Sequence, residues 1–281
     1  LASTVWDASW NWALTALPLF VWMGEILFRT RLSSDMFNGL APWLVRLPGG
    51  LLHVNIVGCG VMAAVAGSSA VTCATVGRMS IPELRKRGYD EGLSIGTLAG
   101  SGTLGLLIPP SIMLIVYGVL AQQSISRLFI AGVLPGILII SIFMAYVSIR
   151  SILNPKLAPI ETFNMSFTEK LKASRHLIPV IGLILCVIGS IYGGYATPTE
   201  AATVGVIGAL ILAGLTKSLS WASFMESLMG GVRTSCMISF ILVGAAFLSV
   251  ALGFTGVPRI LGGYVEALDL SPGMLIVILT I

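Results

Sequence analysis

The sequence contains a series of apolar segments, each about as long as a membrane is thick, and some of them are interrupted by glycine, serine or proline. Crossing the hydrocarbon core of a bilayer takes about 20 mostly apolar residues. Because backbone polar groups find no partner in lipid, such segments must be helical wherever lipid surrounds them. The sequence therefore predicts an all-α, polytopic transmembrane protein. The apolar segments lie near residues 10–28, 51–77, 92–122, 128–149, 177–192, 198–215 and 235–252, and a last one begins at residue 272.

Composition excludes the soluble alternatives. Hydrophobic residues make up 56% of the 281 residues and charged residues only 10%. An average soluble domain contains about 25% charged residues. The formal net charge of +4 does not indicate nucleic-acid binding, because the basic residues lie at the ends of apolar segments, as membrane topology requires. The cysteines lie singly and show no metal-binding spacing; they are Cys59, Cys73, Cys186 and Cys236.

Breaks in two of the apolar segments suggest how the chain is threaded. We interpret residues 49–82 as a re-entrant hairpin that enters and leaves on one side, and residues 92–122 as a broken helix. If the basic turn at residues 85–87 is cytoplasmic, only Arg127 and Arg259 of the 16 Lys and Arg residues fall on the outer side. Since Lys and Arg favour the cytoplasmic side, this distribution supports the hairpin.

A faint internal repeat relates the two ends of the chain. In each copy a span leads to an amphipathic stretch, then to Pro-Gly and an apolar run. The two predicted spans run in opposite directions, so the pattern predicts an inverted repeat, which is common among secondary transporters. One constant offset pairs Pro48-Gly49 with Pro272-Gly273, Gly39 with Gly263, Leu44 with Leu268 and Leu51 with Leu275.

The two breaks hold the chemistry that the apolar segments can offer. The first reads GSSAVTCATVG over residues 67–77, and the second reads SGTLGLLIPPS over residues 101–111. Their glycines permit unusual backbone dihedrals, and Pro109 and Pro110 remove two hydrogen-bond donors. Broken helix is tolerated in a bilayer only where protein or a water-filled cavity covers it. We therefore expect the two breaks to share one protected site. Hydroxyl oxygens there come from Ser68, Ser69, Thr72, Thr103 and Ser111.

The residue types in the breaks restrict what that site can do. Neither break contains a carboxylate, a histidine or a lysine, which excludes ordinary acid–base and nucleophilic catalysis and a calcium cage. Unwound carbonyls and half-helix C-termini suit a sodium ion, and half-helix N-termini suit a carboxylate. The hypothesis is that a bound sodium ion stabilises an anionic substrate beside it. The structural alternative for Gly67 to Ser69 is a small-residue packing face between helices.

At these motifs the sequence resembles the large membrane subunit of the tripartite ATP-independent periplasmic (TRAP) transporters, the DctM-like permease subunit. The resemblance runs through essentially the whole chain, and the second break is its most specific part. The matching segments are GSSAVTCATVG at residues 67–77, IPE at 81–83, RGY at 87–89, GTLGLLIPPS at 102–111, YG at 117–118 and ATPTEAA at 196–202.

The resemblance implies an elevator-type secondary transporter rather than an enzyme, in which the hairpin and the broken helix slide against a scaffold. It implies sodium as the coupling ion, with no other metal and no cofactor. The implied sodium-binding residues are Gly67, Ser68, Ser69, Gly102, Thr103 and Gly105. The implied substrate-binding residues are Ser69, Thr72, Pro109, Pro110 and Ser111.

The resemblance also implies partners and a location. A periplasmic substrate-binding protein would deliver a C4-dicarboxylate, a sialic acid or a similar carboxylate, and a small TRAP membrane subunit would brace the scaffold. The location would be the cytoplasmic (inner) membrane of a bacterium or archaeon. The family has a second hairpin and a second broken helix, so we expect this chain to be part of a longer protein, truncated after residue 281.

The expected domain organisation follows these elements. Residues 1–48 would form the first-repeat span and a cytoplasmic arm helix near 33–47, and residues 49–125 half of the transport domain. Residues 126–232 would form scaffold spans, with a polar cytoplasmic loop at 150–175 and a separate surface helix at 221–231. Residues 233–281 would begin the second inverted repeat.

Other readings remain open. One is a sodium–anion permease of the same inverted-repeat type that works without a binding protein, and another is a membrane scaffold that transports nothing. Among single residues, Glu25 is expected to pair with Arg29 on one helix face, and Glu200 to cap a helix that begins at Pro198. His53 is expected near the cytoplasmic interface.

Overall fold

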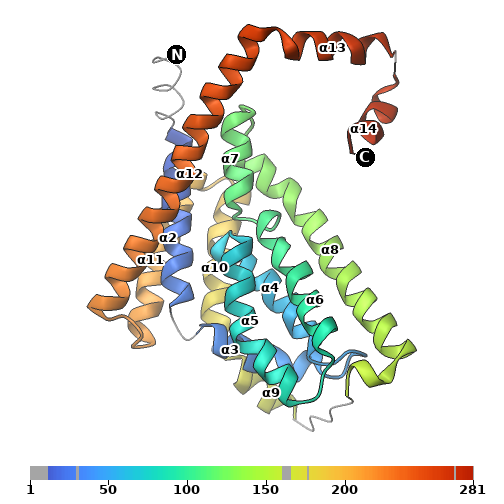
Figure 1. The fold of residues 1–281 in the computed structure, drawn as a ribbon. Helices are drawn as coiled ribbons and strands as arrows, with labels where there is room; N and C mark the ends of the chain where they lie inside the picture. The colour runs from blue at the N-terminus through green and yellow to red at the C-terminus, as the bar shows by residue number, and fades with distance from the viewer. Residues whose placement is uncertain (1–11, 30–31, 160–165, 176, 269, 281) are drawn as a thin grey trace. The chain divides into compact units, whose positions relative to one another are not determined.

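The structure, a computed structural model, describes residues 12–29, 32–159, 166–175, 177–268 and 270–280. Every regular element within these ranges is a helix (Figure 1), as the sequence predicts. The α-helices are α2 (Ala16–Phe28), α3 (Leu32–Leu44), α4 (Leu52–Ala66), α5 (Ser69–Lys86), α6 (Glu91–Gly102), α7 (Ile112–Leu120), α8 (Ile125–Leu153), α9 (Phe167–Ser174), α10 (Ile178–Tyr192), α11 (Pro198–Leu215), α12 (Trp221–Thr255), α13 (Val257–Ala267) and α14 (Pro272–Thr280). Short 3-10 helices are η1 (Trp12–Thr15), η2 (Thr103–Leu106) and η3 (Pro155–Leu157).

Several helices have the length and composition of membrane spans. Among the described residues, α8, α11 and α12 are each long and apolar enough to cross a bilayer, and α2 and α4 are shorter apolar helices. α9 and α10 form a bent pair that passes the same criterion together. The prediction of a polytopic membrane protein is confirmed.

The chain divides into two compact units, and most of the predicted chemistry lies in the larger one. The larger unit is Trp12–Ser235, and the smaller one includes Cys236–Ile281. In the smaller unit α12 ends, and α13 and α14 follow in the order span, short helix, Pro-Gly, apolar helix. The same order holds for α2, α3 and α4. The inverted direction of the two copies stays a prediction.

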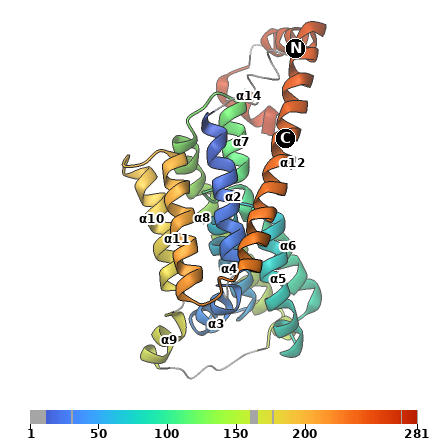
Figure 2. The same cartoon turned by 90° about the vertical axis from the view of Figure 1, so that its left-hand side faces the viewer.

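A layer of packed spans forms one side of the larger unit. α11 packs between α2 and α10, and the three lie side by side (Figure 2). The buried stripe of α11 consists mainly of alanine and glycine, so the helices can approach closely. A Cβ added at Gly205 of α11 would lie 2.5 Å from the Met23 sulfur of α2.

α4 lies at the centre of the larger unit. It packs against α2, α3, α5, α6 and α8, and all of its side chains are buried except those of Val57 and Val61. α2 approaches its C-terminal end so closely that a Cβ at Gly24 would lie 2.9 Å from the Ala66 Cα atom. Protein therefore surrounds this helix on nearly every side.

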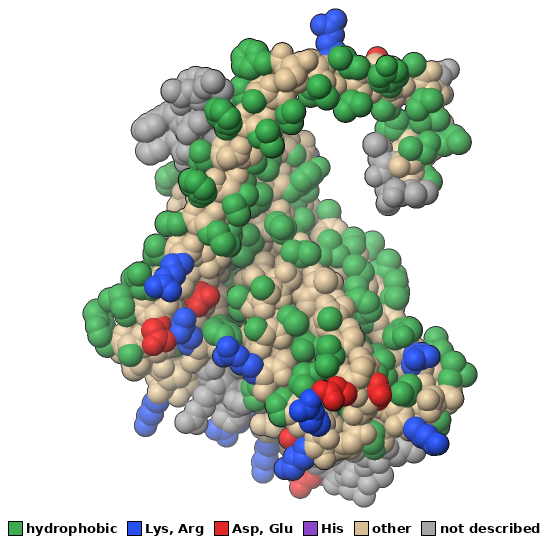
Figure 3. Space-filling model, viewed as in Figure 1, with side chains coloured by type: hydrophobic (Ala, Val, Ile, Leu, Met, Phe, Trp, Pro, Cys, Tyr) green, Lys and Arg blue, Asp and Glu red, His purple; other side chains and the backbone are tan. Residues whose placement is uncertain are grey.

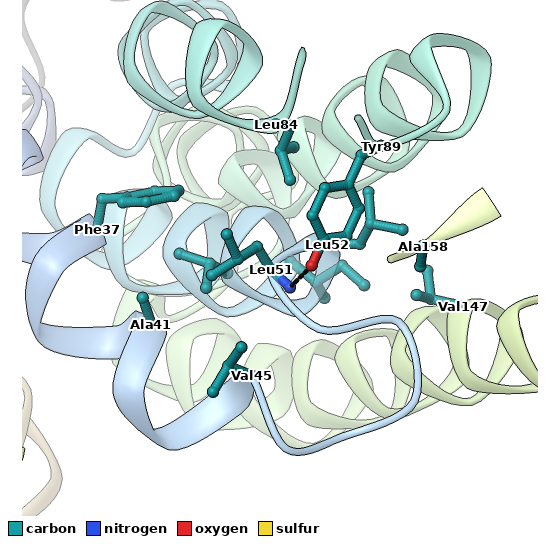
Figure 4. Packing of buried hydrophobic residues seen from close by; sticks show 11 residues of the cluster. Phe37, Ala41, Val45, Leu51, Leu52, Leu84, Tyr89, Val147 and Ala158 are labelled. Carbon is teal, nitrogen blue, oxygen red and sulfur yellow. Dashed lines mark hydrogen bonds between the residues drawn. The ribbon is translucent and has the colours of Figure 1, made fainter. Parts of the chain in front are cut away.

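α4 and α5 form a helical hairpin with its two ends together. The Leu51 N–H donates to the Tyr89 hydroxyl at 3.2 Å, and Leu51, Leu52 and Leu84 share one hydrophobic cluster (Figure 4). His53 is fully buried beside this cluster, with its Nε2 atom 2.7 Å from the Pro48 carbonyl oxygen. The chain thus enters and leaves the hairpin at one end, and its position in a bilayer stays a prediction.

Basic side chains gather at that same end. Lys and Arg side chains, blue in Figure 3, cluster where α3, α9 and the C-terminal end of α5 lie. Arg85 pairs there with Glu91, and Arg87 pairs with Glu83 at 2.6 Å. This is the end that the distribution of Lys and Arg predicts to be cytoplasmic.

α12 corrects one prediction. The sequence predicts a separate helix at 221–231 and a span at 235–252, but the structure has one continuous helix. The Gly230-Gly231 pair reads as a break, yet both glycines are helical and lie against α2. A Cβ at Gly230 would lie 2.6 Å from a Glu25 carboxylate oxygen, and one at Gly231 would lie 3.2 Å from the Trp22 Cβ atom. The glycines provide room for a neighbouring helix rather than a turn.

The predicted polar loop at 150–175 is also corrected. α8 continues to Leu153, η3 follows, and α9 occupies Phe167–Ser174. α9 begins with a capping box, in which the Ser166 N–H donates to the Glu169 carboxylate at 2.8 Å. The S-x-x-E pattern is a helix-start signal that outweighs the polar composition.

The two single-residue predictions about carboxylates are confirmed. Glu25 lies 3.4 Å from Arg29, and Arg29 also pairs with Glu226 of α12 at 2.6 Å. The Thr197 N–H donates to the Glu200 carboxylate at 2.8 Å, which completes a capping box at the start of α11. Both carboxylates therefore have structural partners.

Candidate functional site

The first break is a sharp turn of two residues between α4 and α5. Gly67 has left-handed dihedrals (φ 59°, ψ 10°), and its N–H donates to the Ala63 carbonyl oxygen at 2.9 Å. Ser68 is extended, and its side chain does not cap α5. A glycine ends a helix in this conformation with little steric cost. The turn thus leaves the Ser68 hydroxyl available to a ligand.

The second break is longer and contains no regular helix in its second half. α6 ends at Gly102, η2 covers Thr103–Leu106, and α7 begins at Ile112. The Pro109–Pro110 peptide bond is cis. The Ser111 hydroxyl donates to the Leu106 carbonyl oxygen at 2.6 Å, and the Thr103 hydroxyl donates to the Gly100 carbonyl oxygen at 2.7 Å. Proline cannot donate, so side chains supply part of the bonding.

The structure brings the two breaks into direct backbone contact. The Ile112 N–H donates to the Gly67 carbonyl oxygen at 3.3 Å. A Cβ added at Gly67 would lie 2.6 Å from the Pro110 carbonyl oxygen, and one added at Gly105 would lie 2.8 Å from the Ser68 carbonyl carbon. The glycines at both positions are therefore required by the approach of one break to the other.

Four helix ends converge where the breaks meet. α4 and α6 point their C-terminal ends there, and α5 and α7 begin there. The last carbonyls of a helix carry partial negative charge and the first N–H groups carry partial positive charge. Because residues 67–77 and 101–111 contain no ionisable carboxylate, lysine, arginine or histidine, these partial charges dominate the local field. The site can hold a cation beside carbonyls and an anion beside N–H groups.

The predicted site residues fall into two groups. The first group takes part in the contact between the breaks and consists of Gly67, Ser68, Ser69, Gly105 and Pro110. Gly102 lies next to this contact, and a Cβ added there would lie 3.0 Å from the Cys73 Cβ atom. The others lie around this contact. The Thr103 side chain is exposed, Ser111 is buried, and Thr72 is buried with its hydroxyl oxygen unpaired among the described residues.

Pro109 faces a different environment. It lines an apolar cavity of about 540 Å³ together with Ile108 and side chains of α4, α8 and α10. Val57 and Val61, the two residues of α4 that are not buried, line the same cavity. The second break therefore presents oxygen atoms to the first break and apolar atoms to the neighbouring helices.

Asn55 is a polar residue that the sequence analysis does not identify. It is fully buried in α4, and its side-chain amide donates to the Ser94 carbonyl oxygen and to the Thr97 hydroxyl, each at 3.3 Å. Ser101 of the second break donates to the Thr97 carbonyl oxygen at 2.6 Å. The Asn55 amide oxygen has no partner among the described residues. A single amide within an apolar helix is the signal that could have identified it.

Comparison with a family model decides the family. The model described as "Tripartite ATP-independent periplasmic transporter, DctM component" matches residues 1–281, the whole chain. The chain belongs to the DctM family. As expected from the sequence, it is a multi-pass inner-membrane protein, and the relatives that it matches are named as transporter permease proteins rather than enzymes.

Individual DctM-family proteins are similar over nearly the whole chain. The large permease protein of the ectoine/5-hydroxyectoine TRAP transporter of Ruegeria pomeroyi is 34% identical over 95% of the chain and 62% of its own length. The C4-dicarboxylate TRAP large permease of Pseudomonas aeruginosa is 29% identical over 100% of the chain and 65% of its length. The sialic acid TRAP large permease of Vibrio cholerae is 29% identical over 96% of the chain and 63% of its own length. The chain thus spans less than two thirds of the length of these relatives.

Proposed function

We propose that this chain is the membrane-embedded part of a sodium-coupled transporter that imports small organic anions. The observation that supports the proposal is the contact between two uncharged helix breaks, Gly67-Ser68 and Gly102 to Ser111. Four helix ends meet there without a carboxylate, lysine, arginine or histidine in either break. Such a site has oxygen ligands for a monovalent cation and N–H groups for an anion.

Sodium is proposed to bind on the carbonyl side of this contact. The predicted ligands Gly67, Ser68, Ser69, Gly102, Thr103 and Gly105 lie in or next to the two breaks. Neutral oxygens leave the positive charge of a bound sodium ion uncompensated. That charge would then attract an anionic substrate near Ser69, Thr72, Pro109, Pro110 and Ser111. Coupling follows, because each ligand lowers the electrostatic cost of binding the other.

The substrate is proposed to carry a carboxylate. The relatives are named for ectoine, C4-dicarboxylates and sialic acid, and all of these compounds contain a carboxylate group. A small membrane subunit and a periplasmic substrate-binding protein are the proposed partners, in keeping with the tripartite transporters that the family model describes. The hairpin and the broken helix are proposed to move together against the scaffold.

Uptake by the full-length permease tests this proposal. The permease, its small subunit and its binding protein are reconstituted in proteoliposomes, and uptake of labelled carboxylates is measured with sodium or choline outside. A sodium gradient is expected to drive uptake, and choline is expected to abolish it. Uptake that is unchanged in choline would exclude sodium coupling. Uptake without the binding protein would favour the binding-protein-independent permease.

A matched pair of serine variants tests the location of the site. Ser68→Ala removes a hydroxyl from the first break, and Ser141→Ala removes one from the exposed face of α8, where the Ser141 side chain donates to the Ile137 carbonyl oxygen of its own helix. Ser68→Ala is expected to raise the sodium concentration for half-maximal uptake several-fold, while Ser141→Ala leaves it unchanged. Equal sodium dependence in both variants would show that the sodium ion does not bind at Ser68.

A further inference from the structure

α9 packs on α3 through a set of contacts around one tryptophan, Trp43. The Trp43 indole N–H donates to the Ser174 hydroxyl at 2.8 Å, and that hydroxyl donates to the Gly39 carbonyl oxygen at 2.9 Å. Phe167 meets the Trp43 ring edge-on, with centroids 5.8 Å apart. The Lys170 ammonium lies 5.6 Å from the centroid of the same ring. These contacts hold the short helix in a defined orientation on α3.

That orientation leaves an apolar surface exposed. Phe167 is 67% exposed, Leu171 is 51% exposed and Trp43 is 42% exposed. Phe167 and Leu171 are four residues apart, so they lie on one face of α9. Isolated exposed apolar residues are ordinary on a protein surface. Here Phe167 contacts Trp43 and lies one helical turn from Leu171, and we call these three side chains the α3–α9 surface.

Cationic side chains border the α3–α9 surface. Arg175 follows Leu171 by one helical turn, and Lys172 lies next to Leu171 in the sequence; both are exposed. Neither forms an ion pair among the described residues. The one acidic residue of α9, Glu169, is engaged in the capping box. The border therefore carries positive charge without a protein counter-charge on this helix.

The position of α9 along the chain places this helix next to the apolar helix α10. α10 begins at Ile178, a few residues after α9 ends at Ser174, and the two helices are bent by 64° relative to each other. If α10 crosses the bilayer near its normal, α9 lies closer to the membrane plane than to the normal. A helix with an apolar face, an aromatic residue and flanking cations binds at the lipid headgroup level.

We propose that the α3–α9 surface docks on the anionic headgroups of the leaflet that α10 enters. Trp43, Phe167 and Leu171 insert between the headgroups, while Lys172 and Arg175 bind lipid phosphates. Basic residues near an anionic membrane surface strengthen binding to it. Because Trp43 belongs to α3, lipid binding by α9 also holds the arm helix at the membrane surface. The inference needs α10 to cross a membrane, but it does not need the chain to transport.

Site-directed spin labelling of the full-length protein tests the docking. Nitroxides are attached at Leu171→Cys and, as a control on the neighbouring face, at Thr168→Cys, in a background without native cysteines. The protein is placed in phosphatidylcholine vesicles with and without phosphatidylglycerol. The ratio of oxygen to nickel-chelate accessibility is expected to be several-fold higher at residue 171 than at residue 168, and higher with phosphatidylglycerol. Equal ratios at the two positions in both lipids would overturn the proposal.

Charge reversal tests whether anionic lipid causes the high ratio of oxygen to nickel-chelate accessibility at residue 171. The pair Lys172→Glu and Arg175→Glu is expected to abolish the phosphatidylglycerol effect at residue 171. The matched pair Lys86→Glu and Lys156→Glu, which changes exposed residues outside the α3–α9 surface, is expected to preserve it. Unchanged thermal stability shows that the variants are folded. If residue 171 becomes shielded from the nickel chelate only when the small membrane subunit is added, the surface binds a protein partner, and lipid docking is contradicted.

Discussion

α4 and α8 are both apolar helices, yet the larger unit buries one and exposes the other. All side chains of α4 are buried except those of Val57 and Val61. α8 is nearly twice as long, and its buried residues are confined to a narrow set of positions, Ile125, Phe129, Gly132, Gly136, Val147 and Ser151. Hydropathy alone does not distinguish these two environments, because lipid and protein interiors are similarly apolar.

Polar and small residues do distinguish them. α4 contains His53 and Asn55 and is rich in alanine and glycine, whereas the exposed positions of α8 are mostly isoleucine and leucine. Where α8 is buried, it also has glycine: a Cβ at Gly132 would lie 2.6 Å from the Leu107 carbonyl oxygen of the second break. A helix that must accept neighbours needs small surfaces and satisfied polar groups, and a helix that faces lipid needs neither.

The largest effect of a substitution on uptake is expected at the C-terminal end of α4. Gly67→Ala forces a left-handed residue to carry a Cβ, which costs roughly 1–2 kcal/mol, and places that atom 2.6 Å from the Pro110 carbonyl oxygen. Sodium-dependent uptake by the full-length permease is expected to fall to background. Gly182→Ala in α10 is the control, since no described atom beyond its chain neighbours and its own helix backbone lies within 4 Å of the added Cβ. Normal uptake by the Gly67 variant would show that the breaks need not touch.

Truncation of one isoleucine in each helix measures the difference in packing. Ile56 of α4 is 0% exposed and Ile149 of α8 is 57% exposed. Ile56→Ala is expected to cost about 2–5 kcal/mol of stability, because protein atoms surround the lost groups. Ile149→Ala is expected to change stability by less than about 0.5 kcal/mol. Thermal unfolding in detergent monitors both, and equal losses would mean that α8 is packed as tightly as α4.

Removing a polar side chain from each helix is expected to produce a smaller difference in stability between the two variants. Asn55→Ala removes two hydrogen bonds between α4 and α6 and is expected to destabilise by about 1–3 kcal/mol. Ser141→Ala, which removes only a bond within α8, is expected to remain within about 0.5 kcal/mol of the parent. The same unfolding assay compares them. If Asn55→Ala were as stable as the parent, the amide would not join the hairpin to the broken helix.

The smallest effect is expected at the base of the hairpin. Tyr89→Phe leaves the buried Leu51 N–H without its hydroxyl partner, at a cost of about 1 kcal/mol, the low end of the range for an unpaired buried donor. Tyr146→Phe on α8, where the tyrosine is 52% exposed, is the matched control and is expected to be neutral. Hydrogen exchange at the Leu51 amide should accelerate in the first variant only. Unchanged exchange in both variants would show that this bond contributes nothing measurable.

Much of the fold could be predicted because it depends on local chemistry. The hydropathy pattern predicts the helices, and Gly67 and the Pro109-Pro110 pair predict where two of them break. Capping at Glu200 could also be predicted, since its partner Thr197 is three residues away. The helix α9 was within reach too, because Ser166 and Glu169 form a recognisable start signal.

Other features could not be predicted because they join residues far apart in the chain. The helical state of Gly230 and Gly231 depends on α2 lying beside them, and a glycine pair alone is as compatible with a turn. The partners of Asn55 lie on α6, and those of Trp43 lie on α9. No local pattern specifies which helix will be the neighbour.

Three properties follow from the order of the amino acids alone: this chain is helical, it belongs in a membrane, and its two helix breaks carry oxygen atoms but no charged side chain. These properties depend on composition and on the conformational limits of glycine and proline, which act within a few residues. Three other features arise only when the chain is folded: the Ile112 N–H donates to the Gly67 carbonyl oxygen, protein surrounds α4 on nearly every side, and α9 packs on α3. Packing brings distant backbone segments together, and its outcome depends on all the surfaces that compete for each helix.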